Sequence, residues 1–95
     1  MTQKGDYMKL SENFVLRSIA GESMLIPVGE ASGRVNGIIT LNEVGVLIWN
    51  ALTERCDPAH ALEKIMEAYE VDEQTARTDL EAFLEEMEKL GILQR

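Results

Sequence analysis

The sequence VNGIITLNEVGVLIWNAL, residues 35–52, passes from a strand pattern directly into a helix pattern. Its first part favours a strand because successive residues are β-branched, namely Ile38, Ile39 and Thr40. Apolar residues then recur at the three- and four-residue spacing of a helix face: Leu41, Val44, Leu47, Ile48, Ala51 and Leu52. Asn42, or a capping box of Thr40 with Glu43, is expected to start this helix. The strand is therefore joined to the helix without a loop, so its C-terminal end is held in place.

The composition predicts one small domain. The chain has 95 residues, of which 45% are hydrophobic, enough for a single core. The only cysteine, Cys56, excludes an internal disulfide and fits a reducing compartment. Its only possible imidazole partner is His60, and no third group orients that pair, so we interpret both as structural or surface residues. The sequence contains no evident signal peptide or membrane-spanning stretch, and we expect a soluble, cytoplasmic protein with no membrane partner.

The charge of the chain is acidic and uneven. The formal net charge is -8 and the sequence pI is about 4.5. Residues 1–56 carry six acids and five bases, whereas residues 57–95 carry eleven acids and four bases, so the second segment holds -7 of the net charge. A nucleic-acid partner needs clustered Lys and Arg to neutralise its phosphates. The charge therefore argues against nucleic acid as the partner.

The N-terminal half is predicted to contain three short strands. Residues 1–12 have the pattern of a flexible arm, and residues 13–95 that of the folded domain. The alternation of apolar residues and the turn signals place the strands at residues 14–19, 23–28 and 35–41. Pro27 cannot donate a ladder hydrogen bond, so the second strand is expected to end there or to place Pro27 where an N–H would face away from a partner. Consecutive strands with short connections form an antiparallel meander, which leaves the third strand as an edge with unpaired backbone groups.

The C-terminal half is predicted to be helical. Asp57 and Asp72 are good N-caps for a second and a third helix, and Gly91 is expected to end the third in a left-handed conformation. The apolar residues that follow, Ile92 and Leu93, then fold back onto the core. The two apolar stripes are Ala61, Leu62, Ile65, Met66 and Tyr69, and Ala76, Leu80, Phe83, Leu84, Met87 and Leu90. We therefore predict an α+β fold of the winged helix-turn-helix type, with a three-stranded antiparallel sheet followed by three helices.

With these residues laid out, the chain resembles the coenzyme PQQ synthesis protein D family, the PqqD-like peptide-recognition domains. The likeness covers about residues 12–94, and no single dipeptide in it is specific; the signal is the order and spacing of the motifs. They are Leu41-Asn42, Ile48-Trp49, Ile65 with Tyr69, Asp79-Leu80, Phe83-Leu84 and Leu90-Gly91-Ile92-Leu93. The family commonly has a glycine before the second helix, where this chain has Arg55-Cys56-Asp57.

The resemblance implies a non-catalytic domain that needs no cofactor. It would bind the leader segment of a ribosomally synthesised precursor peptide and present it to a modifying enzyme, in PQQ synthesis or in another peptide-modification (RiPP) pathway. The modifying enzyme would be, for example, a radical-SAM enzyme, a cyclase or a leader peptidase. Domains of this family hold the leader as an added β-strand beside their third strand, in a groove closed by the third helix. This agrees with the edge strand predicted from the residues, and the mechanism is β-augmentation.

Mapped onto this chain, the resemblance places the leader beside the backbone of the third strand, which consists of Val35, Asn36, Gly37, Ile38, Ile39, Thr40 and Leu41. Alternation sends Ile39 and Leu41 to one face and Ile38 and Thr40 to the other, and which face lines the groove stays open. On the third helix one face carries Arg77, Leu80, Glu81 and Leu84, and the neighbouring face runs through Phe83 and Met87. Either helix face could meet the peptide. We expect the single tryptophan, Trp49, in the core rather than at the ligand.

The acidic third helix suggests a preference among leaders. Glu81, Glu85 and Glu88 lie on or near the predicted rim and would favour leaders that carry Lys or Arg. The alternative is that these carboxylates only form a solvated face that keeps the protein soluble. Affinity measured at low and high salt distinguishes the two.

Three other functions compete with this prediction. A winged-helix DNA-binding protein is disfavoured because Arg77 and Lys89 are outnumbered by acids on the third helix. An enzyme is disfavoured because no phosphate-binding loop or metal-ligand spacing is present. An adaptor that uses the same edge strand for a protein partner stays open. We expect a monomer or a weak dimer, because the exposed edge could also pair with a second copy.

Overall fold

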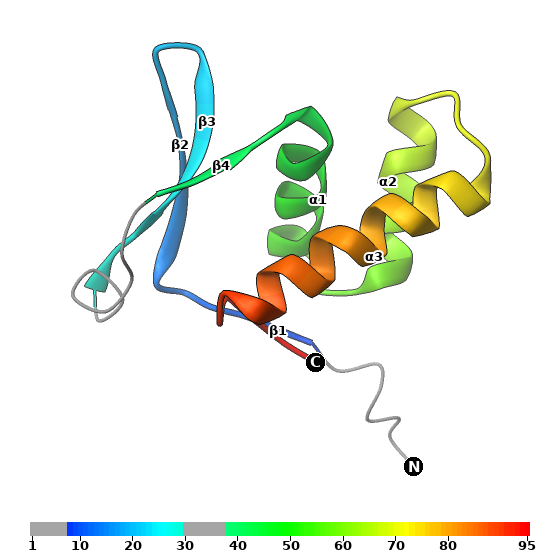
Figure 1. Ribbon diagram of the computed structural model, residues 1–95. Coiled ribbons are helices and arrows are strands. Elements are labelled where there is room, and N and C mark those ends of the chain that lie inside the picture. Colours follow the sequence, from blue (N-terminus) through cyan, green and yellow to red (C-terminus); the bar gives the residue numbers. More distant parts are fainter. Residues whose placement is uncertain (1–7, 30–37) are drawn as a thin grey trace.

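The computed structural model describes residues 8–29 and 38–95. Two layers make up the fold: a β-sheet on one side and a group of helices on the other (Figure 1). The elements in chain order are β1 (Lys9–Leu10), β2 (Phe14–Ile19), β3 (Glu22–Pro27), β4 (Ile39–Leu41), α1 (Glu43–Glu54), α2 (Pro58–Ala68), α3 (Glu73–Lys89) and β5 (Leu93–Gln94). The predicted order of a sheet followed by three helices is confirmed.

The main sheet is an antiparallel meander in the order β2-β3-β4. β2 pairs with β3 from Phe14↔Pro27 to Ile19↔Glu22, and β3 pairs with β4 from Ser23↔Leu41 to Leu25↔Ile39. The hairpin between β2 and β3 turns through Ala20 and Gly21, whose φ values of 53° and 82° suit a type I′ turn. The part of the predicted third strand over residues 35–37 lies outside the described residues.

Side-chain caps start all three helices, as the sequence predicts. Asn42 is the cap of α1, and its Oδ1 accepts a hydrogen bond of 2.8 Å from the N–H of Gly45. This geometry decides against the capping box on Thr40. Asp57 accepts from the N–H of Ala59 at 3.0 Å to start α2, and α3 starts in the same manner at Asp72. Each helix therefore begins at a defined residue, and α1 begins directly after β4 (Figure 1).

The hydrophobic core lies between the inner face of the sheet and the helices. Leu25 and Leu41 reach it from the sheet, and Ile48, Leu52 and Ile65 reach it from the first two helices. Trp49 is 4% exposed and belongs to this core, as predicted. α3 contributes Ala76, Leu80, Leu84 and Met87. Two members of the predicted stripes are exposed instead, Met66 at 40% and Leu90 at 38%, because they lie at the edges of their helix faces.

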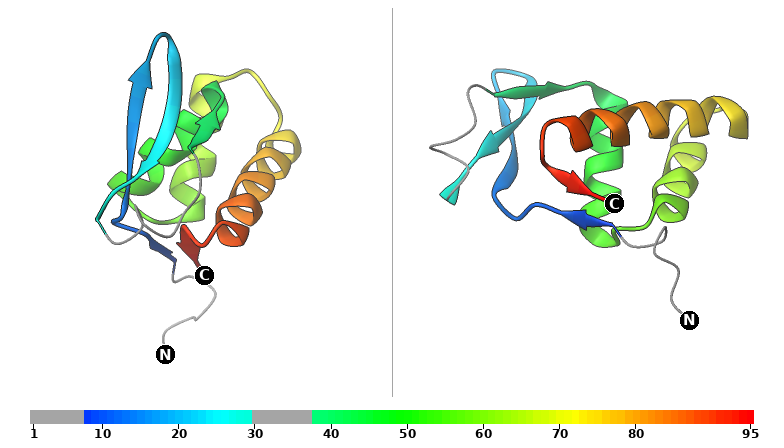
Figure 2. Two further views of the ribbon diagram at one scale, coloured as in Figure 1. Left: turned by 60° about the vertical axis from the view of Figure 1, so that its left-hand side comes forward. Right: turned by 60° about the horizontal axis from the view of Figure 1, so that its bottom comes forward.

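The two ends of the described chain form a second, smaller sheet. β1 pairs antiparallel with β5, with Lys9 opposite Gln94 and Leu10 opposite Leu93 (Figure 2). Gly91 ends α3 with φ of 77°, and Ile92 and Leu93 turn back into the core, as predicted. The sequence predicts a flexible arm over residues 1–12. The structure differs at the end of this segment, where Met8 is buried and β1 is paired with β5. Residues 1–7 of that arm lie outside the described residues.

None of the helices in the described ranges combines the length and the apolar character needed to cross a membrane.

Candidate functional site

A groove lies between β4 and α3, next to the start of α1. Its volume is about 410 Å³. β4 and the first turns of α1 form one wall and the middle of α3 forms the other, so the strand-to-helix junction and the third helix together define the groove. The lining residues are Ile39, Thr40, Leu41, Asn42, Val44, Gly45, Ile48, Asp79, Ala82, Phe83, Glu86 and Met87.

β4 presents an open backbone edge to this groove. In an antiparallel sheet, every second residue of a strand points its backbone N–H and C=O toward the same neighbouring strand. The N–H of Val28 donates to the carbonyl of Asn13, which precedes β2, at 2.7 Å. Counting back from Val28 in steps of two, Met24 points its backbone groups toward β2 as well. Ser23 and Leu25, the residues in between, therefore point toward β4 and bond to their partners there. By the same alternation, the backbone N–H and C=O of Thr40 point away from β3. Among the described strands β4 has β3 as its one neighbour, so these groups are available for a further strand.

The side chains of β4 alternate between the core and the solvent. Leu41 is buried and Ile39 is half-buried against the core, whereas Thr40 is exposed and Ile38 is 55% exposed. The core-facing side is therefore the one that carries Ile39 and Leu41, whereas the groove is lined by residues of both faces, Ile39, Thr40 and Leu41. Substitutions at Thr40 can probe the open edge without removing a core side chain.

The groove combines an apolar floor with two carboxylates on α3. Val44 and Phe83 are half-buried, and Ile48 and Met87 lie beneath them in the core. Asp79 and Glu86 are exposed lining residues, and neither takes part in an ion pair within residues 8–29 and 38–95. No basic side chain lines the groove. The described groove is thus apolar at its base and negatively charged on its helical wall.

The structure does not bring the predicted α3 face, Arg77, Leu80, Glu81 and Leu84, to the groove. Leu80 and Leu84 are core residues, 6% and 2% exposed. Arg77 and Glu81 line a separate hollow of about 480 Å³ on another side of α3. The alternative face through Phe83 and Met87 meets the groove instead, together with Asp79, Ala82 and Glu86. Of the strand positions, Ile39, Thr40 and Leu41 line the groove, Ile38 directly precedes β4, and Val35, Asn36 and Gly37 lie outside the described residues.

On the side of α3 away from the groove, two acids are paired with Arg95. Arg95 donates to Glu81 at 2.7 Å and lies 3.4 Å from the carboxylate of Glu88. The hydrogen bond from Arg95 lowers the pKa of Glu81, and the same hydrogen bond raises the pKa of Arg95. Glu85 lies on this side too, in the hollow that Arg77 and Glu81 line. Two of the three predicted rim acids, Glu81 and Glu88, are therefore paired with Arg95.

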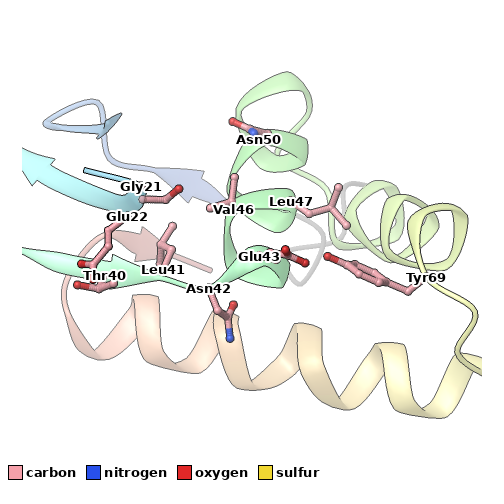
Figure 3. A pocket seen from close by; sticks show the side chains of 11 residues that line it. Gly21, Glu22, Thr40, Leu41, Asn42, Glu43, Val46, Leu47, Asn50 and Tyr69 are labelled. Carbon is pink, nitrogen blue, oxygen red and sulfur yellow. The ribbon is translucent and has the colours of Figure 1, made fainter. Parts of the chain in front are cut away.

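A second hollow, of about 590 Å³, lies across the junction of β4 and α1 from the groove (Figure 3). The tip of the hairpin, the first half of α1 and Tyr69 surround it, with Val46 and Leu47 as apolar lining residues. β3 and β4 are paired with each other where they border this hollow, at Ser23↔Leu41. Thr40 lines this hollow as well as the groove, so the open edge at Thr40 borders both, but α3 contributes no residue to the larger hollow.

Cys56 and His60, the two residues considered as a reactive pair from the sequence, lie outside the groove. Burial raises the pKa of the Cys56 thiol, which favours its protonated form. His60 lies 3.0 Å from Glu54, an exposed carboxylate whose pKa this hydrogen bond lowers. Within the described ranges, no group of His, Cys, Asp and Glu side chains could hold a metal ion.

Residues 14–93 match the profile of the family described as coenzyme PQQ synthesis protein D (PqqD). The chain belongs to this family. The match begins at β2 and ends in β5, so it contains every element of the PqqD domain that borders the groove.

Two solved structures share this PqqD fold. A structure described as "TbiB1 in Complex with the TbiA(beta) Leader Peptide" is similar with a TM-score of 0.74 and 28% identity, over 90% of this chain and 94% of that one. A second, described as "Lasso peptide synthetase B1 complexed with the leader peptide", has a TM-score of 0.74 and 20% identity, over 93% and 98% of the two chains. The second likeness bears on the fold alone. No curated protein matches the chain.

Proposed function

We propose that this protein is a non-catalytic carrier that binds the leader segment of a ribosomally synthesised precursor peptide and presents it to a modifying enzyme. The observation that carries the proposal is the open edge of β4 above an apolar groove. Membership of the PqqD family supports it, and so does the likeness to a structure whose description names a bound leader peptide.

The binding mode that we propose is strand addition. An extended leader would exchange main-chain hydrogen bonds with Thr40, and with Ile38 two residues before it. Leader side chains on one face would then enter the groove and pack on Val44 and Phe83. Main-chain bonds fix the register of the peptide, and the groove selects its side chains.

The junction of β4 with α1 favours binding by a preformed site. The cap of α1 at Asn42 follows β4 directly, so the C-terminal end of β4 is anchored by a helix. An anchored strand loses little conformational freedom when a peptide pairs with it, and the cost of ordering falls mainly on the leader. The open edge is thus suited to capturing a flexible peptide.

We propose that the enzyme that receives the precursor peptide is, for example, a radical-SAM enzyme, a cyclase or a leader peptidase. The genes beside the one for this protein identify both the enzyme and the precursor. We propose that binding and presentation take place in the cytoplasm, where a ribosomal product and its modifying enzymes are together.

A heteronuclear NMR titration tests the proposal. The labelled protein is titrated with short peptides encoded beside its gene. Amide shifts concentrated in residues 38–41 and along residues 79–87 are expected from strand addition at β4. Shifts along β2, the other edge of the sheet, would place the peptide elsewhere. Shifts with a neighbouring protein and with none of the peptides would instead make this protein an adaptor.

A further inference from the structure

We propose that the groove selects leaders that place a Lys or Arg side chain against α3, where Asp79 and Glu86 receive its charge. This inference rests on the proposed function and names the class of peptide that the groove accepts. It differs from the preference predicted from the sequence, which relied on Glu81, Glu85 and Glu88.

The walls of the groove differ in the charge that they present. β4 contributes no charged residue to it, and α1 contributes none, because Glu43 lines the second hollow instead. α3 contributes Asp79 and Glu86, and no base compensates them. The formal charge of the lining is therefore -2, in a hollow with an apolar floor. Asp79 and Glu86 are exposed in the free protein, and a leader that covers the groove would displace water from them and so strengthen their attraction for a cation.

Asp79 and Glu86 have no ion-pair partner within the described ranges, unlike several other acids on the same helix. Glu81 and Glu88 are paired with Arg95, and Glu73 is paired with Arg77. A leader that covers the groove removes water from Asp79 and Glu86. Loss of water around an unpaired carboxylate is unfavourable, so an apolar or acidic side chain at this place weakens binding, and a basic one strengthens it.

The spacing of the two acids suits a basic side chain that lies along α3. Asp79 and Glu86 are seven residues apart, which is about 10.5 Å along a helix. Phe83 lies between them on the same helix face, since it follows Asp79 by four residues and precedes Glu86 by three. A Lys or Arg stem can cover the Phe83 ring while its cation reaches either carboxylate, and the ring itself attracts a cation. Same-face residues of a strand repeat at about 6.7 Å, so a leader with two basic residues can also use both acids.

A selection from random peptides tests this inference with no knowledge of the natural precursor. A displayed library of random 12-residue peptides is selected against the immobilised full-length protein and against the variants Asp79→Asn, Glu86→Gln and the double variant. Glu85→Gln is the matched control, because it removes one exposed carboxylate from α3 outside the groove. Circular dichroism and thermal unfolding verify that each variant is folded.

The expected result is enrichment of Lys or Arg at one or two positions with the wild type and with Glu85→Gln. The double variant loses this enrichment and keeps the apolar preferences. A basic peptide selected on the wild type should bind the double variant about tenfold more weakly, the loss typical of one well-placed charge pair. The reversed variant Glu86→Lys should instead enrich Asp or Glu.

Two results overturn the inference and are distinct from failure of the proposed function. Peptides could be enriched that shift the amides of β4 yet show no basic preference, or the preference could persist in the double variant. Either result would leave strand addition standing and remove the role of the two acids. If no enriched peptide shifted the amides of β4 in any variant, the proposed function would fail, and the inference with it.

Discussion

Both sides of α3 carry acidic residues, but these residues differ in whether a basic side chain is paired with them. On the groove side, Asp79 and Glu86 face an apolar hollow and have no ion-pair partner in the described part of the chain. On the other side, Glu81 and Glu88 are held by Arg95. The difference shows that a count of acidic residues along a helix does not tell which of them have a counter-charge. On the inference above, a basic leader would meet acids that lack one and that also line the groove.

The largest expected effect separates the core face of α3 from its groove face. Leu84→Ala should lower the free energy of unfolding by about 2–5 kcal/mol, because Leu84 is 2% exposed and its removal leaves a cavity. Phe83→Ala should cost less, about 1–2 kcal/mol, since Phe83 is only half-buried. Chemical denaturation measures both. Equal losses for the two variants would mean that Phe83 is a core residue and not part of the groove floor.

The next prediction compares two neighbouring positions of β4. Thr40→Pro removes the N–H that points to the open edge and should weaken binding of a leader peptide about tenfold or more, while the fold is kept. Ile39→Pro removes a group that points to β3 and should destabilise the sheet itself. Calorimetric titration and thermal unfolding distinguish these outcomes. Unchanged affinity in a folded Thr40→Pro variant would place the peptide away from this edge.

Salt should affect the groove side more than the paired side. Raising the salt concentration from about 20 mM to about 500 mM should weaken binding of a basic peptide several-fold, because the Debye length falls well below 10 Å. The double variant Asp79→Asn with Glu86→Gln should show a shallower salt dependence, and Glu81→Gln should show the wild-type slope. Fluorescence anisotropy at several salt concentrations provides the measurement. An identical slope in all three proteins would speak against a charged groove.

The smallest expected effect is a pH dependence on the paired side. The pKa of Glu81 is lowered in the folded state, so its pair with Arg95 stabilises the fold above the ordinary pKa of about 4.5 and is lost as the pH falls through the lowered value. Both side chains are substantially exposed, so the contribution is about 0.5 kcal/mol. Between pH 6 and pH 3 the wild type should lose more stability than Glu81→Gln. Parallel curves for the two proteins would show that this pair contributes nothing.

Much of the fold follows from local signals in the sequence. The alternation of residues 14–19 predicts β2, and single residues set the helix starts at Asn42, Asp57 and Asp72, because a cap depends only on its neighbours within one turn. β1 and β5 carry no such signal. Each is only two residues long, and they pair across almost the whole chain, so no periodicity could indicate them.

The face of α3 that borders the groove was harder to predict because two faces of this helix have the same spacing. Arg77, Leu80, Glu81 and Leu84 follow an i, i+3, i+4, i+7 pattern, and so do Asp79, Ala82, Phe83 and Glu86, two residues further on. Periodicity identifies a face but not its surroundings, which depend on where β4 and the C-terminal residues lie. Likewise, the capture of Glu81 and Glu88 by Arg95 depends on the turn at Gly91, which brings the last residue back along α3.

The antiparallel pairing of β1 with β5 places both ends of the described domain next to each other, with Lys9 opposite Gln94. A short linker from residue 95 to residue 8 could therefore close the chain into a ring, and new termini could be opened at the hairpin turn of Ala20 and Gly21. The same closeness means that the domain could be inserted whole into a surface loop of another protein, entering and leaving at one point. The groove lies on other elements, β4, α1 and α3, and would keep its shape in either arrangement.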